Sequence, residues 1–243
     1  MLTQRMTTLV EQWKAVGDRR SIFLACYRRM TKNMLSAVAR HDFFDPDWVA
    51  HLIDSFADYY FAALAAWERD QSGPAVWQYS FTYANRQNAS VAQHLLLGVN
   101  AHINCDLALV LDDLLHQEWP LLSAEQQRQR HADYLAVNRV IEQTIDRVQD
   151  EVIAPYSATL QLLDAVCGPF DEWCTARLIR NWRNDVWRQA LAVMSLNDQE
   201  EHLTDRHQVD QLALARAYLL SGNLTEVRSF GYPLRWLKRL RLL

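Results

Sequence analysis

Residues 94–116 constrain the fold most strongly, because their helical wheel is apolar on every side. Leucines and valines recur between Leu95 and Leu111 in all directions when residues are placed 100° apart. A helix without a polar face has to be covered by other helices. Ser90 is a candidate N-cap, and Pro120 ends the pattern. We therefore predict a central helix over residues 90–118 of an all-α bundle.

The composition supports this fold class. Gly and Pro number six each, and a sheet protein of this length needs many tight turns that draw on both residues. No stretch alternates strictly between apolar and polar residues between turn signals, so we expect no sheet of note. The chain is predicted to be a single bundle-like domain over 1–243, with about nine or ten helices. The polar stretch 197–211 is expected to be a solvated loop and helix start, and 197–243 is a possible C-terminal appendage.

Start and stop signals place the remaining helices. Asp45-Pro46 joins an Asp cap to a Pro at the first helical position, and Ser123 to Gln126 reads as a capping box. Asp18 is a candidate cap for the second helix. The expected helices cover residues 2–13, 20–40, 46–70, 75–86, 90–118, 124–151, 157–166, 172–196 and 204–220, with a last one from 233.

Four polar residues interrupt the middle of the central helix: Asn100, His102, Asn104 and Asp106. His102 and Asp106 are at i and i+4 and share one face, while Asn100 and Asn104 share another. Asp113, one heptad beyond Asp106, returns to the face of the His-Asp pair. A buried carboxylate costs several kcal/mol unless it is paired or bound to a cation. These residues therefore need partners in the core.

Three explanations remain open for the pair. It can be structural, with Asp106 accepting from His102 or from an arginine of a neighbouring helix. It can be a metal site, since His and Asp one turn apart can ligate one divalent ion, with Asp54 as a tentative further ligand. It can also be an acid-base site without metal, in which Asp106 orients the imidazole of His102. In the catalytic readings Asn104 contacts the substrate or holds the neighbouring helix.

Other helices offer candidate substrate contacts. Asp54 and Asp58 form an i, i+4 pair in a helix that is otherwise aromatic. Arg183 lies next to Trp182 and one turn before Trp187, and it is a candidate for holding a negative group, with a structural ion pair as the alternative. We predict Asn100, Asp58 and Trp187 as substrate-binding residues and Arg183 as part of the catalytic set.

A second polar line is formed by Asn138, Glu142 and Asp146, spaced four residues apart. It is either a solvated helix face or an ion-binding line. His131 and Asp133, near the start of the same helix, are expected to be exposed. Cys26 and Cys105 lie in predicted helices and are expected to be buried small hydrophobes rather than nucleophiles.

The function expected from these patterns is a small-molecule enzyme with a buried His-Asp site, acting on an apolar or amphipathic substrate. A non-catalytic binding protein and a helical adaptor with a structural polar core are the alternatives. A net charge of −4 argues against nucleic acid as a partner. We expect a cytoplasmic protein with reduced cysteines, without a secretory leader or a transmembrane segment. The basic amphipathic end 235–243 either docks on the bundle or contacts a membrane surface.

Residues 96–107, Leu-Leu-Gly-Val-Asn-Ala-His-Ile-Asn-Cys-Asp-Leu, resemble the signature of domain-of-unknown-function family 5995, a group of uncharacterised and mostly bacterial proteins. Looser similarity extends over residues 22–31, 44–61, 77–86, 133–148 and 183–187. The resemblance implies one continuous helical domain. It also implies that Asn100, His102, Asn104, Asp106 and Arg183 belong to the family pattern. It transfers no substrate or cofactor.

Overall fold

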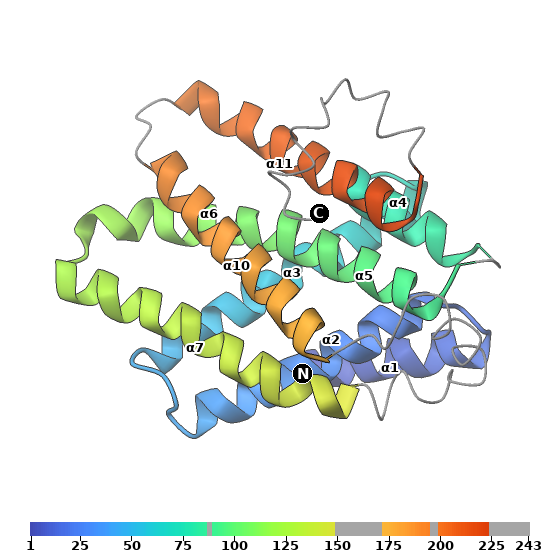
Figure 1. The fold of residues 1–243 in the computed structure, drawn as a ribbon, viewed down its shortest axis with the longest axis horizontal. Helices are drawn as coiled ribbons and strands as arrows, with labels where there is room; N and C mark the ends of the chain where they lie inside the picture. Colours follow the sequence, from blue (N-terminus) through green and yellow to red (C-terminus); the bar gives the residue numbers. More distant parts are fainter. Residues whose placement is uncertain (87–88, 149–171, 195–198, 224–243) are drawn as a thin grey trace.

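A computed structural model describes residues 1–86, 89–148, 172–194 and 199–223, and these contain helices and no strand. Figure 1 shows their arrangement. The α-helices are α1 (Leu2–Ala15), α2 (Arg20–Ala39), α3 (Pro46–Asp70), α4 (Ala75–Ala84), α5 (Val91–Ala101), α6 (Leu107–Glu118), α7 (Ala124–Val148), α10 (Glu172–Met194) and α11 (Gln199–Leu220). A π-helical turn, η1 (His102–Asp106), joins α5 to α6, and a 3-10 turn, η2 (Trp119–Leu121), follows α6.

The all-α prediction is confirmed. With α5, η1 and α6 counted as one rod, the described part of the chain has eight helices, close to the expected nine or ten. The stretch 197–211, expected as a solvated loop and the start of a helix at residue 204, is helical already from Gln199, where α11 begins. The predicted helices at 157–166 and from 233, together with the basic end 235–243, lie outside the described residues.

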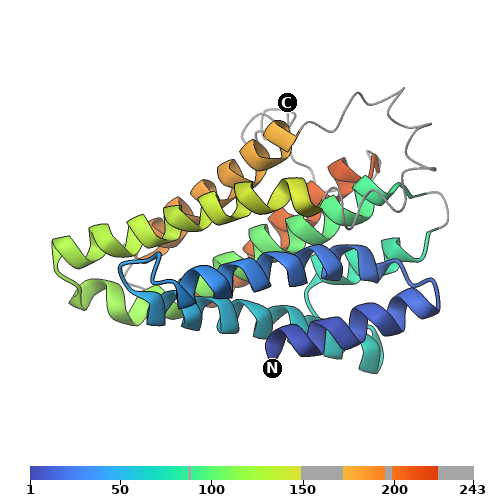
Figure 2. The same cartoon turned by 90° about the horizontal axis from the view of Figure 1, so that it is seen from below.

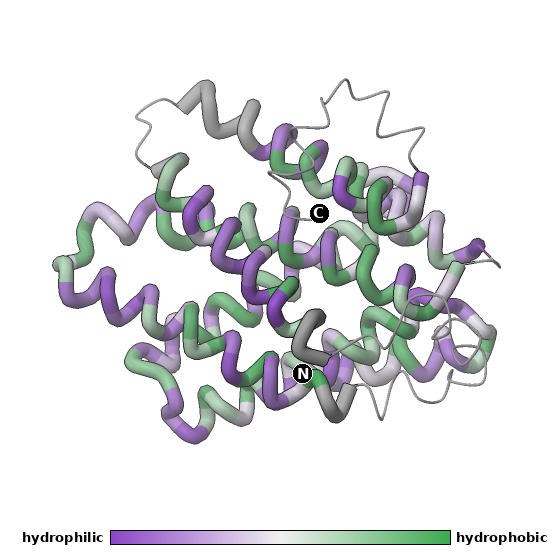
Figure 3. The backbone as a smooth tube through the Cα atoms, in the orientation of Figure 1, coloured by the Kyte–Doolittle hydropathy of each residue, from purple (hydrophilic) through white to green (hydrophobic). Residues whose placement is uncertain are grey.

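The rod of α5, η1 and α6 is central, as its apolar wheel predicts. It packs against α2, α3, α4, α10 and α11. In Figure 2, α7 and α10 lie toward the top and α1 to α3 toward the bottom, with much of the rod between them. Figure 3 shows hydrophilic residues recurring along α7 and α10, whereas hydrophobic residues predominate along α5. The helices α7 and α10 therefore supply part of the polar outer surface.

The rod has a second property that follows from its composition. The segment Val91–Leu121 is long and apolar enough to cross a membrane, whereas the sequence was expected to hold no such segment. In the fold, 78% of its most apolar window is buried inside the protein. Its hydrophobic surface is thus largely covered by the chain's own helices.

Capping hydrogen bonds are present at two of the predicted helix starts. The Asp45 carboxylate accepts from the backbone N–H of Trp48 at 3.0 Å, with Pro46 at the first helical position. The Ser123 backbone N–H donates to Gln126 Oε1 at 2.9 Å, and the Gln126 N–H donates to Ser123 Oγ at 3.3 Å. Each contact satisfies an amide that a helix terminus leaves without an internal partner.

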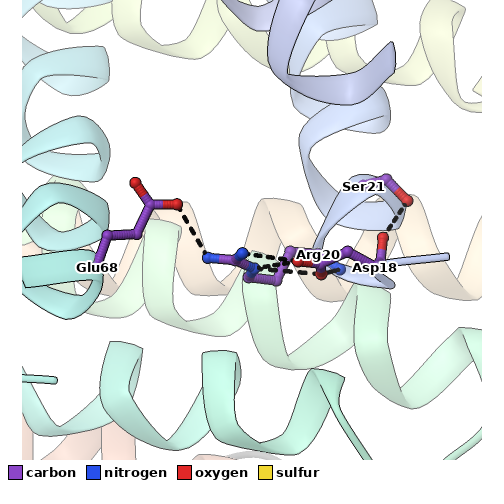
Figure 4. A network of polar contacts seen from close by, with 4 residues as sticks. All are labelled: Asp18, Arg20, Ser21 and Glu68. Carbon is purple, nitrogen blue, oxygen red and sulfur yellow. Dashed lines mark hydrogen bonds and ion pairs between the residues drawn. The ribbon is translucent and has the colours of Figure 1, made fainter. Parts of the chain in front are cut away.

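Asp18 was the candidate cap of the second helix, but the N-cap of α2 is Arg19, and Asp18 instead holds the turn that leads into the helix. Its Oδ1 accepts from the Arg20 backbone N–H at 2.9 Å, and its carbonyl accepts from Ser21 Oγ at 2.7 Å (Figure 4). The Arg20 guanidinium bridges Asp18 and Glu68, at 2.6 and 3.2 Å. Because Glu68 belongs to α3, this network ties the start of α2 to the end of α3.

Asp133 corrects a prediction. It was expected to be exposed, but only 1% of its surface is accessible. Its carboxylate accepts from the backbone N–H groups of Phe44 and Asp45, at 2.7 and 2.8 Å. Asp210 holds the first two amides of α4 in the same way, at 2.8 and 2.9 Å. Both aspartates reach across from other helices, and no local sequence pattern reports such a contact. His131 is exposed, as expected.

Gly98 lets α5 lie close to α2. A Cβ atom at this position would lie 2.4 Å from Cγ of Phe23. Real carbon atoms do not approach that closely, so the contact requires glycine. This close approach brings the ring of Phe23 into the core beside the polar part of the rod.

Candidate functional site

The polar residues of the rod lie in and beside the π-helical turn. All five residues of this turn, His102–Asp106, are buried. A single π turn inside an α-helix inserts an extra residue into the hydrogen-bond ladder, and such turns are frequent at functional sites. The unusual backbone therefore coincides with the residues that the sequence singles out.

His102 and Asp106 form the hydrogen bond that their spacing favours. Nδ1 of His102 lies 2.9 Å from Oδ2 of Asp106, with 5% and 1% of the two residues exposed. The indole Nε1–H of Trp77, on α4, donates to Oδ1 and Oδ2 of Asp106 at 2.9 and 3.0 Å. Trp77 completes the site, and the sequence carries no local signal for this contact across helices.

Burial controls the protonation of the pair. Loss of solvent raises the pKa of Asp106 well above its ordinary value, and the hydrogen bond from Trp77 opposes that rise. The same loss of solvent lowers the pKa of His102 well below its ordinary value. Both directions disfavour a charged side chain. Nε2 of His102 is buried and has no hydrogen-bond partner among the described residues.

Aromatic rings enclose the imidazole. The ring of Phe56 lies flat against His102, with centroids 3.5 Å apart and planes inclined by 6°. Tyr27 meets the imidazole edge-on at 4.2 Å, and Phe23 does so at 5.7 Å. Such contacts fix the ring plane.

His102 lines a cavity of about 180 Å³. Its walls come from α2, α3, α5, η1, α6, α7 and α10, and they are mainly aliphatic and aromatic. The polar members of the lining are Cys26, Tyr27, Thr31, His102 and Arg183. Burial raises the pKa of the Cys26 thiol to about 12, so it remains a neutral apolar group, as expected. The candidate site is thus an apolar cavity with few polar groups in its lining.

Arg183 reaches the same cavity from α10. Its Nε donates to Asn138 Oδ1 at 2.8 Å, and Nη2 donates to the carbonyl of Tyr134 at 3.0 Å. The guanidinium also stands 4.3 Å from the centre of the Tyr134 ring. Burial lowers its pKa, and in the described part of the chain no carboxylate pairs with it. The ion pair considered for this arginine is instead made by Arg180, with Glu142.

The two asparagines face away from this cavity. Asn100 donates to the carbonyl of Ala213 at 2.8 Å, and Asn104 donates to Asn100 Oδ1 at 3.0 Å. Arg216 donates to Asn104 Oδ1. Since Ala213 and Arg216 both belong to α11, the asparagine pair joins that helix to the rod, and neither asparagine lines the cavity.

The other candidates lie apart from the His-Asp pair. Asp54 and Asp58 are exposed on α3. Trp187 is buried against the rings of Tyr134 and His131, outside the cavity lining. Among the described residues no group of three or more His, Cys, Asp or Glu side chains is placed to hold a metal ion.

The remaining polar positions are surface or inter-helix contacts. Asp113 pairs with Arg206 at 2.8 Å and accepts from the hydroxyl of Tyr59. Asn138 is buried beneath Arg183, so the line it begins is not a simple solvated face. Asp146 lies outside the side chains that the structure describes.

Fold and site together define a class: an all-α protein with a buried His-Asp pair beside an apolar cavity. The chain belongs to the family of unknown function DUF5995, whose model matches residues 2–222. This confirms the family suggested by residues 96–107. No curated protein and no solved structure matches the chain.

Proposed function

We propose that the protein is a small-molecule enzyme whose His102–Asp106 pair exchanges a proton with a largely apolar substrate. One observation carries the proposal. Nδ1 of His102 is held by a buried carboxylate, while Nε2 has no partner in the described part of the chain, and the residue lines an apolar cavity. An unpartnered buried polar atom costs free energy, and that cost is relieved when a ligand supplies the partner.

The protonation of the pair gives the chemistry. Burial favours a pair without net charge, in which one proton lies between Oδ2 and Nδ1 and a second lies on Nε2. Nε2–H then donates to an oxygen atom of the substrate. When that proton is transferred, the proton of Asp106 moves to Nδ1, and Nε2 becomes a base that can accept a proton in turn. His102 is the catalytic residue, and Asp106 is a positioning residue with Trp77 behind it.

The cavity supports a small and largely apolar substrate. Its volume of about 180 Å³ is comparable to the roughly 150 Å³ apolar cavity that binds benzene in another protein. A molecule of about six to eight heavy atoms with one oxygen acceptor fits this space. An apolar wall excludes water, which strengthens the hydrogen bond from Nε2–H to a developing negative charge.

The test uses 2-hexanone labelled with 13C at the carbonyl. Binding to the protein should move the carbonyl resonance downfield, because Nε2–H polarises the C=O bond. In D2O the protein should also speed deuterium incorporation beside the carbonyl, on the order of a hundredfold. His102→Asn keeps a donor toward Asp106 and removes Nε2. It should bind the ketone with neither effect. Equal carbonyl shifts in both proteins would contradict the proposal.

A non-catalytic binding protein is the second candidate. The flat stacking of Phe56 on His102 favours it, because this ring covers one face of the imidazole. Its signature is a shifted carbonyl resonance with no acceleration of deuterium exchange. Asp106→Asn separates the two functions further. It leaves a side chain that can accept from Trp77, but it has no carboxyl proton to pass to Nδ1, so exchange should fall while binding persists.

A further inference from the structure

We infer that the ligand of this cavity is an amphipathic anion, with Arg183 as the group that holds its negative end. The inference rests on the proposed function, since it assigns a substrate class to the same cavity. The observation behind it is a buried cation without a counter-ion. Arg183 is 4% exposed, and within the described residues its acceptors are an amide oxygen and a backbone carbonyl, both neutral.

Arg216 is also buried and donates to the neutral Asn104, but it does not line the cavity, and several other arginines contact a carboxylate. Arg20, Arg130 and Arg206 each lie within 3.2 Å of a carboxylate oxygen, and each keeps more contact with solvent than Arg183. On α10 itself, Arg180 pairs with Glu142 and Arg188 with Asp185. Arg183 is the arginine that lines the apolar cavity. A charge in such surroundings calls for an opposite charge, and the cavity is the space where a ligand can bring one.

The guanidinium has capacity left for this role. Of its five N–H donors, the hydrogen bonds to Asn138 and Tyr134 occupy the one on Nε and one on Nη2. Asn138 and Tyr134 hold the plane of the group, so its remaining donors are fixed in direction. A planar guanidinium matches the two oxygens of a carboxylate. The ligand class is therefore a short apolar chain that ends in a carboxylate or a similar anion.

The test compares hexanoate with 1-hexanol, which share a chain length and differ in charge. Binding is followed by ligand-observed NMR at pH 6 and pH 8. Without an anion site only neutral hexanoic acid enters, and its fraction falls about a hundredfold over this range. With Arg183 as the anchor, hexanoate affinity should change less than about threefold. A hundredfold fall would overturn the inference.

Variants add a second measurement. Arg183→Met should weaken hexanoate binding by about tenfold or more and leave 1-hexanol binding unchanged. Arg180→Met, one turn away on the same helix and outside the cavity lining, is the matched control and should affect neither ligand. If Arg183→Met does not fold, the pH comparison in the parent protein still decides.

The two proposals fail separately. If the carbonyl of bound 2-hexanone shifts in the parent protein and not in His102→Asn, but hexanoate follows its neutral fraction, the anionic ligand class is wrong and the role of His102 stands. If hexanoate binds independently of pH while the ketone carbonyl is not polarised, Arg183 is the anchor and the chemistry proposed for His102 is wrong. If none of these ligands binds, both proposals are wrong.

Discussion

The indole N–H of Trp77 donates to both carboxylate oxygens of Asp106, at 2.9 and 3.0 Å. Asp106 is thereby held between a neutral donor on α4 and His102 on its own helix. A carboxyl group fixed from two sides keeps the imidazole in one orientation. Trp77 therefore belongs to the same hydrogen-bonded group as the pair.

Trp77→Phe should lower the free energy of unfolding by more than the loss of side-chain volume alone would. The variant removes the donor to Asp106, and a buried group that loses its partner costs roughly 1–2 kcal/mol. Trp182→Phe is the matched control. Trp182 is equally buried, and its indole nitrogen has no partner among the described residues. Urea unfolding of both variants measures the difference, and equal losses would show that the Trp77 hydrogen bond contributes nothing.

His94 gives a pH dependence with a definite sign. Burial, assisted by the charge of Arg19, lowers its pKa from 6.5 to about 4. Between pH 6.5 and pH 4 His94 binds a proton in the unfolded chain but stays neutral in the folded protein. The stability that neutral His94 contributes is therefore complete above pH 6.5 and declines toward pH 4.

The measurement is the free energy of unfolding of the parent and of His94→Gln between pH 7.5 and pH 4. The parent should lose roughly 2–3 kcal/mol more than the variant across this window. Parallel curves would mean that His94 titrates alike in the folded and unfolded chains.

Asp133→Asn should loosen the entry to α3. The buried carboxylate accepts from two consecutive amides, and a side-chain amide has only one oxygen for them. We expect the free energy of unfolding to fall by roughly 1–3 kcal/mol. The control Asp42→Asn, in the exposed turn nearby, should lower it by less than about 0.5 kcal/mol. Hydrogen exchange at Phe44 and Asp45 localises the effect. Unchanged protection of these amides would contradict it.

Gly98→Ala tests the close approach of α2 and α5. Alanine is the better helix former by about 1 kcal/mol, yet its Cβ would meet the ring of Phe23. The steric overlap should outweigh the better helix propensity and lower the free energy of unfolding by roughly 1–3 kcal/mol. In a double-mutant cycle, Phe23→Leu should recover much of this loss. Additive effects would show that the two residues do not meet.

The sequence was sufficient to predict the all-α fold and the contact between His102 and Asp106. An apolar wheel over residues 90–118 predicts a covered rod, and the i, i+4 spacing predicts that His102 and Asp106 meet. These are local consequences of helical geometry. The contacts that cross between helices were not predictable, because spacing along one chain segment does not report which helix lies opposite.

Three residues illustrate this limit. Trp77 lies in no sequence motif, Asp133 was expected to be exposed, and Asn104 was expected either to contact the substrate or to hold the neighbouring helix. Each is defined by a partner far away in the chain: Asp106, the start of α3, and α11. The asparagine pair joins two packed helices through hydrogen bonds. A polar residue in an apolar helix therefore does not by itself mark an active site.

The central claim is that His102 presents a protonated Nε2 to a ligand in the apolar cavity. The most direct measurement is the 15N spectrum of histidine-labelled protein at pH 7, with His102→Asn used to assign the resonance and 2-hexanone added in steps. The account predicts a neutral imidazole with its proton on Nε2, whose resonance moves as the ketone binds. An unprotonated Nε2, or a resonance that ignores the ketone at saturation, would contradict it.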